Sequence, residues 1–131
     1  MAAAINLKTL NLSYNLFETY TIVNPNLKHI LMPNNELTSF DTTNAVNLIT
    51  INIRLNKITQ LDISKNMLIE ALNTGDNKLT SIGFGHKPEL KHLACFSNFL
   101  TTLDVCGFDK LVYLSVNRNP DLSCVKIKSG Q

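Results

Sequence analysis

The chain has 131 residues, of which 44% are hydrophobic and 17% are charged. This length fits one domain, and no apolar stretch approaches the roughly 20 residues that cross a bilayer. The formal net charge of +2 is small and the twelve Lys and Arg residues are scattered, so the composition excludes a nucleic-acid or membrane-surface patch.

Residues 1–6, MAAAIN, precede a repeating pattern. They contain no basic segment and no long apolar segment, so they do not form a secretory signal. Either the protein is intracellular or the chain is a piece of a longer protein.

From residue 7 onward, apolar residues recur in the order L-x-x-L-x-L, and an asparagine follows three residues later. The asparagines lie 20, 21, 21, 21 and 21 residues apart, at Asn15, Asn35, Asn56, Asn77, Asn98 and Asn119. A period of 20 to 50 residues is typical of a solenoid, whose coils must stack because none can bury its own apolar face.

The first half of each repeat predicts a short β-strand, because apolar and polar residues alternate there. The central inward column is Leu10, Ile30, Ile51, Leu72, Leu93 and Leu114. A buried asparagine at the following corner can bond backbone groups that the turn leaves unpaired. Asparagines in successive coils are therefore expected to form a ladder.

The second half of each repeat has about ten residues, too few for a helix of three turns and two loops. It therefore predicts extended or 3₁₀ structure and little α-helix. An aspartate with an expected turn-capping role follows an inward residue in three copies, at Asp41, Asp62 and Asp104. Gly83 takes this position in a fourth copy and predicts a variant turn. The sixth copy slips, with Leu122 and Cys124 as the expected inward residues.

Five stretches resemble the leucine-rich repeat (LRR) pattern L-x-x-L-x-L-x-x-N-x-L, namely LKTLNLSYNLF, LKHILMPNNEL, LITINIRLNKI, IEALNTGDNKL and LKHLACFSNFL. The second halves resemble the bacterial 21-residue subclass, in LTSFD, ITQLDIS, LTSIG and LTTLDV. The ending NPDLSCVKI resembles the last repeat of secreted Bacteroidetes LRR proteins. The resemblance covers residues 7 to 131. It implies a right-handed solenoid of about six coils, a parallel β-sheet on the concave face, and a bacterial protein that is secreted or on the cell surface.

We expect a single LRR domain over residues 1–131, with repeats at 7–26, 27–47, 48–68, 69–89, 90–110 and 111–131. Neither end carries the amphipathic capping segment that natural solenoids use. The chain is therefore expected to be a piece of a longer protein. The alternative is a small complete protein whose ends associate with a partner or with a second copy.

The sequence predicts no catalytic residue, no metal site and no cofactor. His29 and His92 fall in one outward column three coils apart, roughly 14 Å, whereas zinc–nitrogen bonds are ~2 Å long. No Ser-His-Asp set, phosphate-binding loop or zinc-ligand spacing is present. The odd count of three cysteines predicts core thiols at Cys95 and Cys124 and a free surface thiol at Cys106. A Cys106–Cys124 disulfide between adjacent coils is the alternative.

The outward side chains of the predicted sheet vary between coils, so they are the positions that can encode specificity. The candidate binding residues are Phe96, Tyr113, His92, Arg54, Leu31 and Tyr14. The first three are expected to form one aromatic cluster, with Arg54 two coils away across a gap of small residues. Aromatic and Arg side chains are the usual anchors of protein interfaces.

The predicted function is therefore a non-catalytic interaction module that recognises a protein partner through its concave face. A glycan or a peptide is an alternative ligand. The alternative function is a structural spacer or recognition arm of a larger secreted or surface protein.

Overall fold

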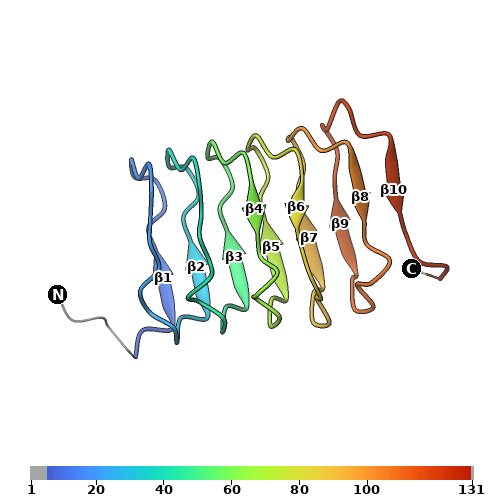
Figure 1. Ribbon diagram of the computed structural model, residues 1–131. Coiled ribbons are helices and arrows are strands. Elements are labelled where there is room, and N and C mark those ends of the chain that lie inside the picture. Colours follow the sequence, from blue (N-terminus) through green and yellow to red (C-terminus); the bar gives the residue numbers. More distant parts are fainter. Residues whose placement is uncertain (1–5, 131) are drawn as a thin grey trace.

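The computed structural model describes residues 6–130, which form six coils stacked side by side in chain order (Figure 1). Residues 1–5 and 131 lie outside the described part. The prediction that residues 1–6 are not a secretory signal therefore falls mostly on residues outside it. The strands are β1 (Thr9–Asn11), β2 (His29–Leu31), β3 (Thr50–Asn52), β4 (Leu61–Asp62), β5 (Ala71–Asn73), β6 (Ile82–Gly83), β7 (His92–Ala94), β8 (Thr102–Asp104), β9 (Tyr113–Ser115) and β10 (Cys124–Lys126).

One face of the stack is a six-stranded parallel sheet in the order β1-β2-β3-β5-β7-β9. Each strand pairs in register with the equivalent residues one repeat later, as Ile51 does with Leu72. The outward surface of this sheet is called the sheet face below, and it is the face that the family resemblance expects to be concave. The opposite side is extended and carries the two-stranded pairs β4–β6 and β8–β10. The predicted LRR solenoid is confirmed.

The described residues 6–130 contain no helix, and thus no helix long and apolar enough to cross a membrane. The second halves of the repeats combine short extended segments with tight turns. In one such turn the Ala45 N–H donates to the Thr42 carbonyl (2.9 Å), and in the next the Leu48 N–H donates to the Ala45 carbonyl (3.2 Å).

The core consists of the apolar columns that the repeat predicts. Ile30, Ile51 and Leu93 are completely buried, because a coil covers each of them on either side. Leu10 and Leu114 occupy the same column in the first and last coils and are only partly buried, because each has a neighbouring coil on one side only. Burial therefore depends on stacking and not on the residue type alone.

The asparagines join each coil to the one before it. Asn77 Nδ2 donates to the carbonyl oxygen of Ile53 in the preceding coil (2.9 Å) and to those of Thr74 (3.0 Å) and Gly75 (3.2 Å) in its own coil. Its Oδ1 accepts the backbone N–H of Ile58, again from the preceding coil (3.0 Å). The same two links to the preceding coil occur at Asn35, Asn56, Asn98 and Asn119.

The residue before each ladder asparagine has a left-handed backbone, with φ between 52° and 57°. These residues are Tyr14, Asn34, Leu55, Asp76, Ser97 and Arg118. A left-handed backbone costs roughly 1–2 kcal/mol for a side chain such as that of Leu55. The conformation persists because the backbone N–H of Leu55 donates to the carbonyl of Gly75 (3.0 Å) and so continues the hydrogen bonding between coils.

The recurrent aspartates cap turns, as predicted. Asp62 Oδ1 accepts the backbone N–H of Ser64 (2.8 Å), and Asp104 Oδ1 accepts that of Cys106 (3.0 Å). Hydrogen bonds from Ser64 hold the pKa of Asp62 below its ordinary value, so this carboxylate stays ionised.

The expected inward position of Cys124 in the sixth coil is wrong. β10 pairs with β8 at an offset of 22 residues instead of 21, with Cys124 opposite Thr102. Because a slip of one residue reverses which face a side chain occupies, Cys124 is exposed, while Leu122 packs against the core. Cys124 lies opposite a residue four positions before Cys106, too far along the strand for a disulfide. Both thiols are free.

Cys95 is buried and free, as expected for a core thiol. Burial raises its pKa to about 12. It therefore stays protonated at neutral pH and is a poor nucleophile.

Lys87 is a buried charge that the sequence analysis did not identify. It has no exposed surface and occupies an inward column whose equivalents are Asn66 and Phe108 in the adjacent coils. Its Nζ donates to the carbonyl oxygen of His86 (3.1 Å). Burial lowers the pKa of Lys87, and the nearby charge of Asp62 opposes this effect in part.

Replacing Lys87 by Met is expected to raise the free energy of unfolding by about 1 kcal/mol at pH 7, because the variant no longer buries a charge. The folded-state pKa of Lys87 is lowered, so the parent gains stability as the pH rises from that pKa toward the ~10.4 of the unfolded chain. The advantage of the variant should shrink over this range. Urea titrations between pH 7 and pH 10.5 measure both effects.

The exposed Lys78 provides the control, since Lys78→Met removes the same charge from the surface. A loss of stability in Lys87→Met that is absent from Lys78→Met would mean that the bond to His86 outweighs the cost of burial.

Candidate binding surface on the six-stranded sheet

Arg54 and Phe96 form one connected unit on the sheet face, although they lie two coils apart. The ring of Phe96 covers Gly75 so closely that a Cβ at Gly75 would lie 2.4 Å from Phe96 Cζ. The guanidinium carbon of Arg54 lies 5.4 Å from the centre of this ring. Arg54 Nε also donates to Asp76 Oδ2 at 2.8 Å. The cation–π contact and the ion pair together fix the direction of Arg54.

His92 and Tyr113 form a second pair, with ring centres 6.3 Å apart and planes inclined by 38°. The expected cluster of three rings is therefore wrong, because Phe96 extends toward Gly75 and Arg54 instead. The expected gap of small residues between Phe96 and Arg54 is filled by the Phe96 ring itself. Gly75 permits this arrangement, because a side chain at position 75 would occupy the space that the Phe96 ring fills.

A pocket of about 360 Å³ opens at the centre of the sheet face. It is lined by Leu31, Thr50, Ile51, Asn52, Ala71, Leu72, Asn73, His92, Ala94 and Tyr113. Three of the predicted binding residues, Leu31, His92 and Tyr113, thus border one cavity. The short side chains of Ala71 and Ala94 leave the space open.

Tyr14 lies apart from the other predicted binding residues. It follows β1, and its side chain is highly exposed, at 78%. It borders a different groove of about 530 Å³ with Glu36, Lys57 and Asp76 among the lining residues. This groove runs along the turns that follow the strands and carries charges of both signs.

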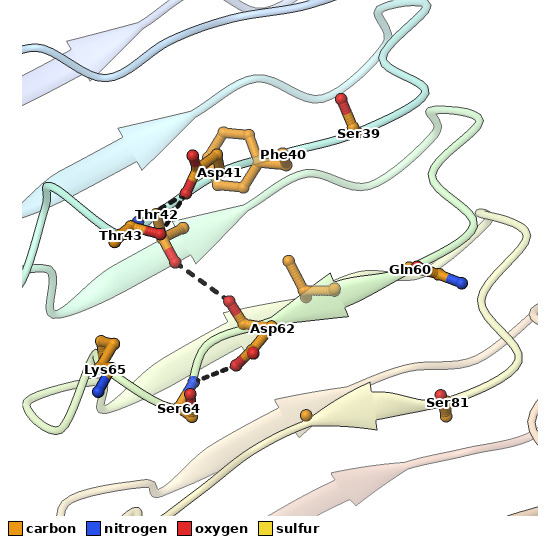
Figure 2. Close-up of a pocket in the computed structure, with 12 residues that line it drawn as sticks. Ser39, Phe40, Asp41, Thr42, Thr43, Gln60, Asp62, Ser64, Lys65 and Ser81 are labelled. Atoms are coloured by element: carbon orange, nitrogen blue, oxygen red, sulfur yellow. Dashed lines mark hydrogen bonds between the residues drawn. The ribbon is translucent and has the colours of Figure 1, made fainter.

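A polar groove of about 550 Å³ lies over the second halves of the repeats, near β4 and β6 (Figure 2). Asp41 and Asp62 come from neighbouring coils and each bonds to its own turn, while Thr42 Oγ1 donates to the Asp62 carbonyl (3.4 Å). Hydrogen bonds from Thr43 lower the pKa of Asp41. No three His, Cys, Asp or Glu residues within 6–130 are grouped to hold a metal ion. These carboxylates have a structural role.

Sequence reasoning missed the importance of Asp76 and Gly75. Asp76 holds Arg54, and Gly75 provides the surface on which Phe96 rests. The available signal was an outward glycine with an arginine one coil before it and a phenylalanine one coil after it, all at the same repeat position.

Comparison with models of protein families finds no match, and comparison with curated protein sequences finds none either. Among solved structures, the chain is similar to the functional domain of InlJ from Listeria monocytogenes, which includes a cysteine ladder. The TM-score is 0.68 at 21% sequence identity, over 91% of this chain and 32% of that one. Cys95, by contrast, stands alone in its column among the described residues, between Thr74 and Val116. The common coil geometry and the 21-residue spacing identify the fold of this chain as a leucine-rich repeat solenoid.

Proposed function

We propose that the chain is a non-catalytic interaction module that recognises a protein partner through the sheet face. The observation that carries this proposal is the Arg54–Phe96 unit, which contacts Gly75 and Asp76 beside an open pocket. Arginine and aromatic side chains that are already fixed lose little conformational entropy on binding, which makes them effective anchors.

The size of the sheet face supports a protein ligand. Six strands spaced by ~4.8 Å span roughly 29 Å, and a standard interface buries about 800 Å² on each partner. A partner would therefore use most of the face, including the Arg54–Phe96 unit and the His92–Tyr113 pair. The bacterial source, the secreted or surface location, the repeat boundaries and the association of chain ends stay predictions.

A capture experiment tests this proposal with the triple variant Phe96→Ala/Tyr113→Ala/Arg54→Ala. The parent and the variant are immobilised after circular dichroism shows both folded, and cell and culture-medium extracts are passed over each. The parent is expected to retain a protein that the variant loses, because the variant lacks the anchors.

The matched control is Phe99→Ala/Met67→Ala/Lys78→Ala, which removes an aromatic, an apolar and a basic side chain that are exposed elsewhere on the surface. It should capture the same protein as the parent. Equal capture by all three chains, or capture by none, would contradict the proposal and favour the spacer function.

A further inference from the structure

The pocket on the sheet face is lined by apolar side chains, amides, a threonine, a tyrosine and a histidine. None of its ten lining residues is aspartate, glutamate, lysine or arginine. Arg54, which lies on the same face, is already paired with Asp76. A cation that entered the pocket would lose its hydration without meeting a carboxylate, and an anion would do so without meeting a lysine or an arginine, which is costly. The lining therefore selects an uncharged ligand group.

Two side-chain amides supply hydrogen-bond donors at the pocket. Asn52 and Asn73 lie opposite each other on β3 and β5. The Oδ1 atoms accept the backbone N–H groups of Arg54 (3.2 Å) and Gly75 (3.0 Å). Neither Nδ2 group donates to another residue in the described part of the chain, so both remain available to carbonyl oxygens of a ligand. Their spacing is that of adjacent strands, ~4.8 Å.

The size and lining of the pocket fit one aromatic ring. A volume of about 360 Å³ is at the low end of the ~300–1,000 Å³ typical of ligand pockets, which is enough for one ring. His92 and Tyr113 provide aromatic walls on one side, and aromatic rings attract one another in offset or edge-on arrangements. Ala71 and Ala94 leave the depth that such a ring needs.

We propose that this pocket binds a single uncharged aromatic side chain of the partner protein, while Asn52 and Asn73 donate to backbone carbonyls beside it. The inference rests on the proposed function, because it assigns the anchor that a protein partner inserts. It adds a chemical selectivity that the Arg54–Phe96 unit does not specify.

Small probes test this selectivity without a known partner. Nuclear magnetic resonance of the 131-residue chain follows the methyl signals of Ala71 and Ala94 during titration with p-cresol, the side-chain analogue of tyrosine. Saturable shifts are expected. Benzoate and benzamidine, which are of similar size but charged, should bind at least about tenfold more weakly. Absence of saturable shifts with p-cresol, or equal binding of the charged probes, would overturn the proposal.

Two matched variants locate the site. Ala71 and Thr9 occupy the same outward column, on β5 and β1 respectively. Ala71→Phe should fill the pocket and abolish the response to p-cresol, whereas Thr9→Phe should leave it unchanged. Ala94→Leu gives a second way to fill the pocket if Ala71→Phe fails to fold. Unchanged binding in a folded, filled variant would place the probe elsewhere and overturn the assignment.

The probe experiment and the capture experiment test the two proposals independently. If p-cresol does not bind but the triple variant loses its partner, the sheet face binds protein without this anchor. If p-cresol binds and no protein is captured, the pocket keeps its selectivity and the proposed interaction function is wrong.

Discussion

Replacing Asn77 by alanine is expected to lower the free energy of unfolding by about 3–5 kcal/mol. The substitution leaves the buried N–H of Ile58 without its partner. It also removes one of the two amide donors from the carbonyls of Ile53 and Thr74, which keep Asn56 and Asn98 respectively. Each hydrogen bond lost in this way costs about 0.5–1.5 kcal/mol. Each buried polar group left unsatisfied costs about 1–3 kcal/mol. Since a domain is stable by only about 5–15 kcal/mol, urea unfolding followed by circular dichroism should show a large fall in the midpoint.

The first coil contains a matched control for this ladder variant. Asn15 occupies the same repeat position but is exposed, and among the described residues its Nδ2 bonds to Leu12 and Ser13 in its own coil. Asn15→Ala should cost less than about 1 kcal/mol, because water can replace these bonds. If the two variants were equally stable, the ladder would not be what holds adjacent coils together.

Leu93→Ala is the second substitution with a large expected effect, about 2–5 kcal/mol of destabilisation. Leu93 has no exposed surface and is covered by the coils on either side, so its removal leaves a cavity. Each coil of a solenoid is stabilised mainly by its neighbours, so a cavity at this position weakens two interfaces between coils. Thermal and urea unfolding of the variant measure the loss.

Leu114→Ala makes the same chemical change in the last coil, where the side chain is only partly buried. Its expected cost is smaller than that of Leu93→Ala, because less apolar area is lost from the core. Equal losses of stability in the two variants would show that a leucine in this column stabilises the fold to the same extent whether or not coils cover it on both sides.

The repeat predicts the features that recur in every coil. The alternation around Ile51 indicates a strand, its position in the period indicates the inward face, and Asp62 occurs where a turn needs a cap. These properties depend on local chemistry that each copy repeats, which is why sequence alone is sufficient for them.

Departures from the repeat were harder to predict. Cys124 faces outward because a single additional residue changes the pairing of β10, and no local property of the cysteine reveals this. The direction of the Phe96 ring depends on a glycine one coil away. Leu55 adopts a left-handed backbone although no copy has glycine at this position, because hydrogen bonds between coils impose the conformation.

The ladder asparagines and the strands connect each coil only to its immediate neighbours, and these hydrogen bonds point along the axis of the stack. Tension between the two ends of the molecule would therefore pull the bonds along their own direction. Such bonds break a few at a time, whereas a sheet pulled along its strands must break many at once. Under load the molecule should therefore lengthen in steps of one coil.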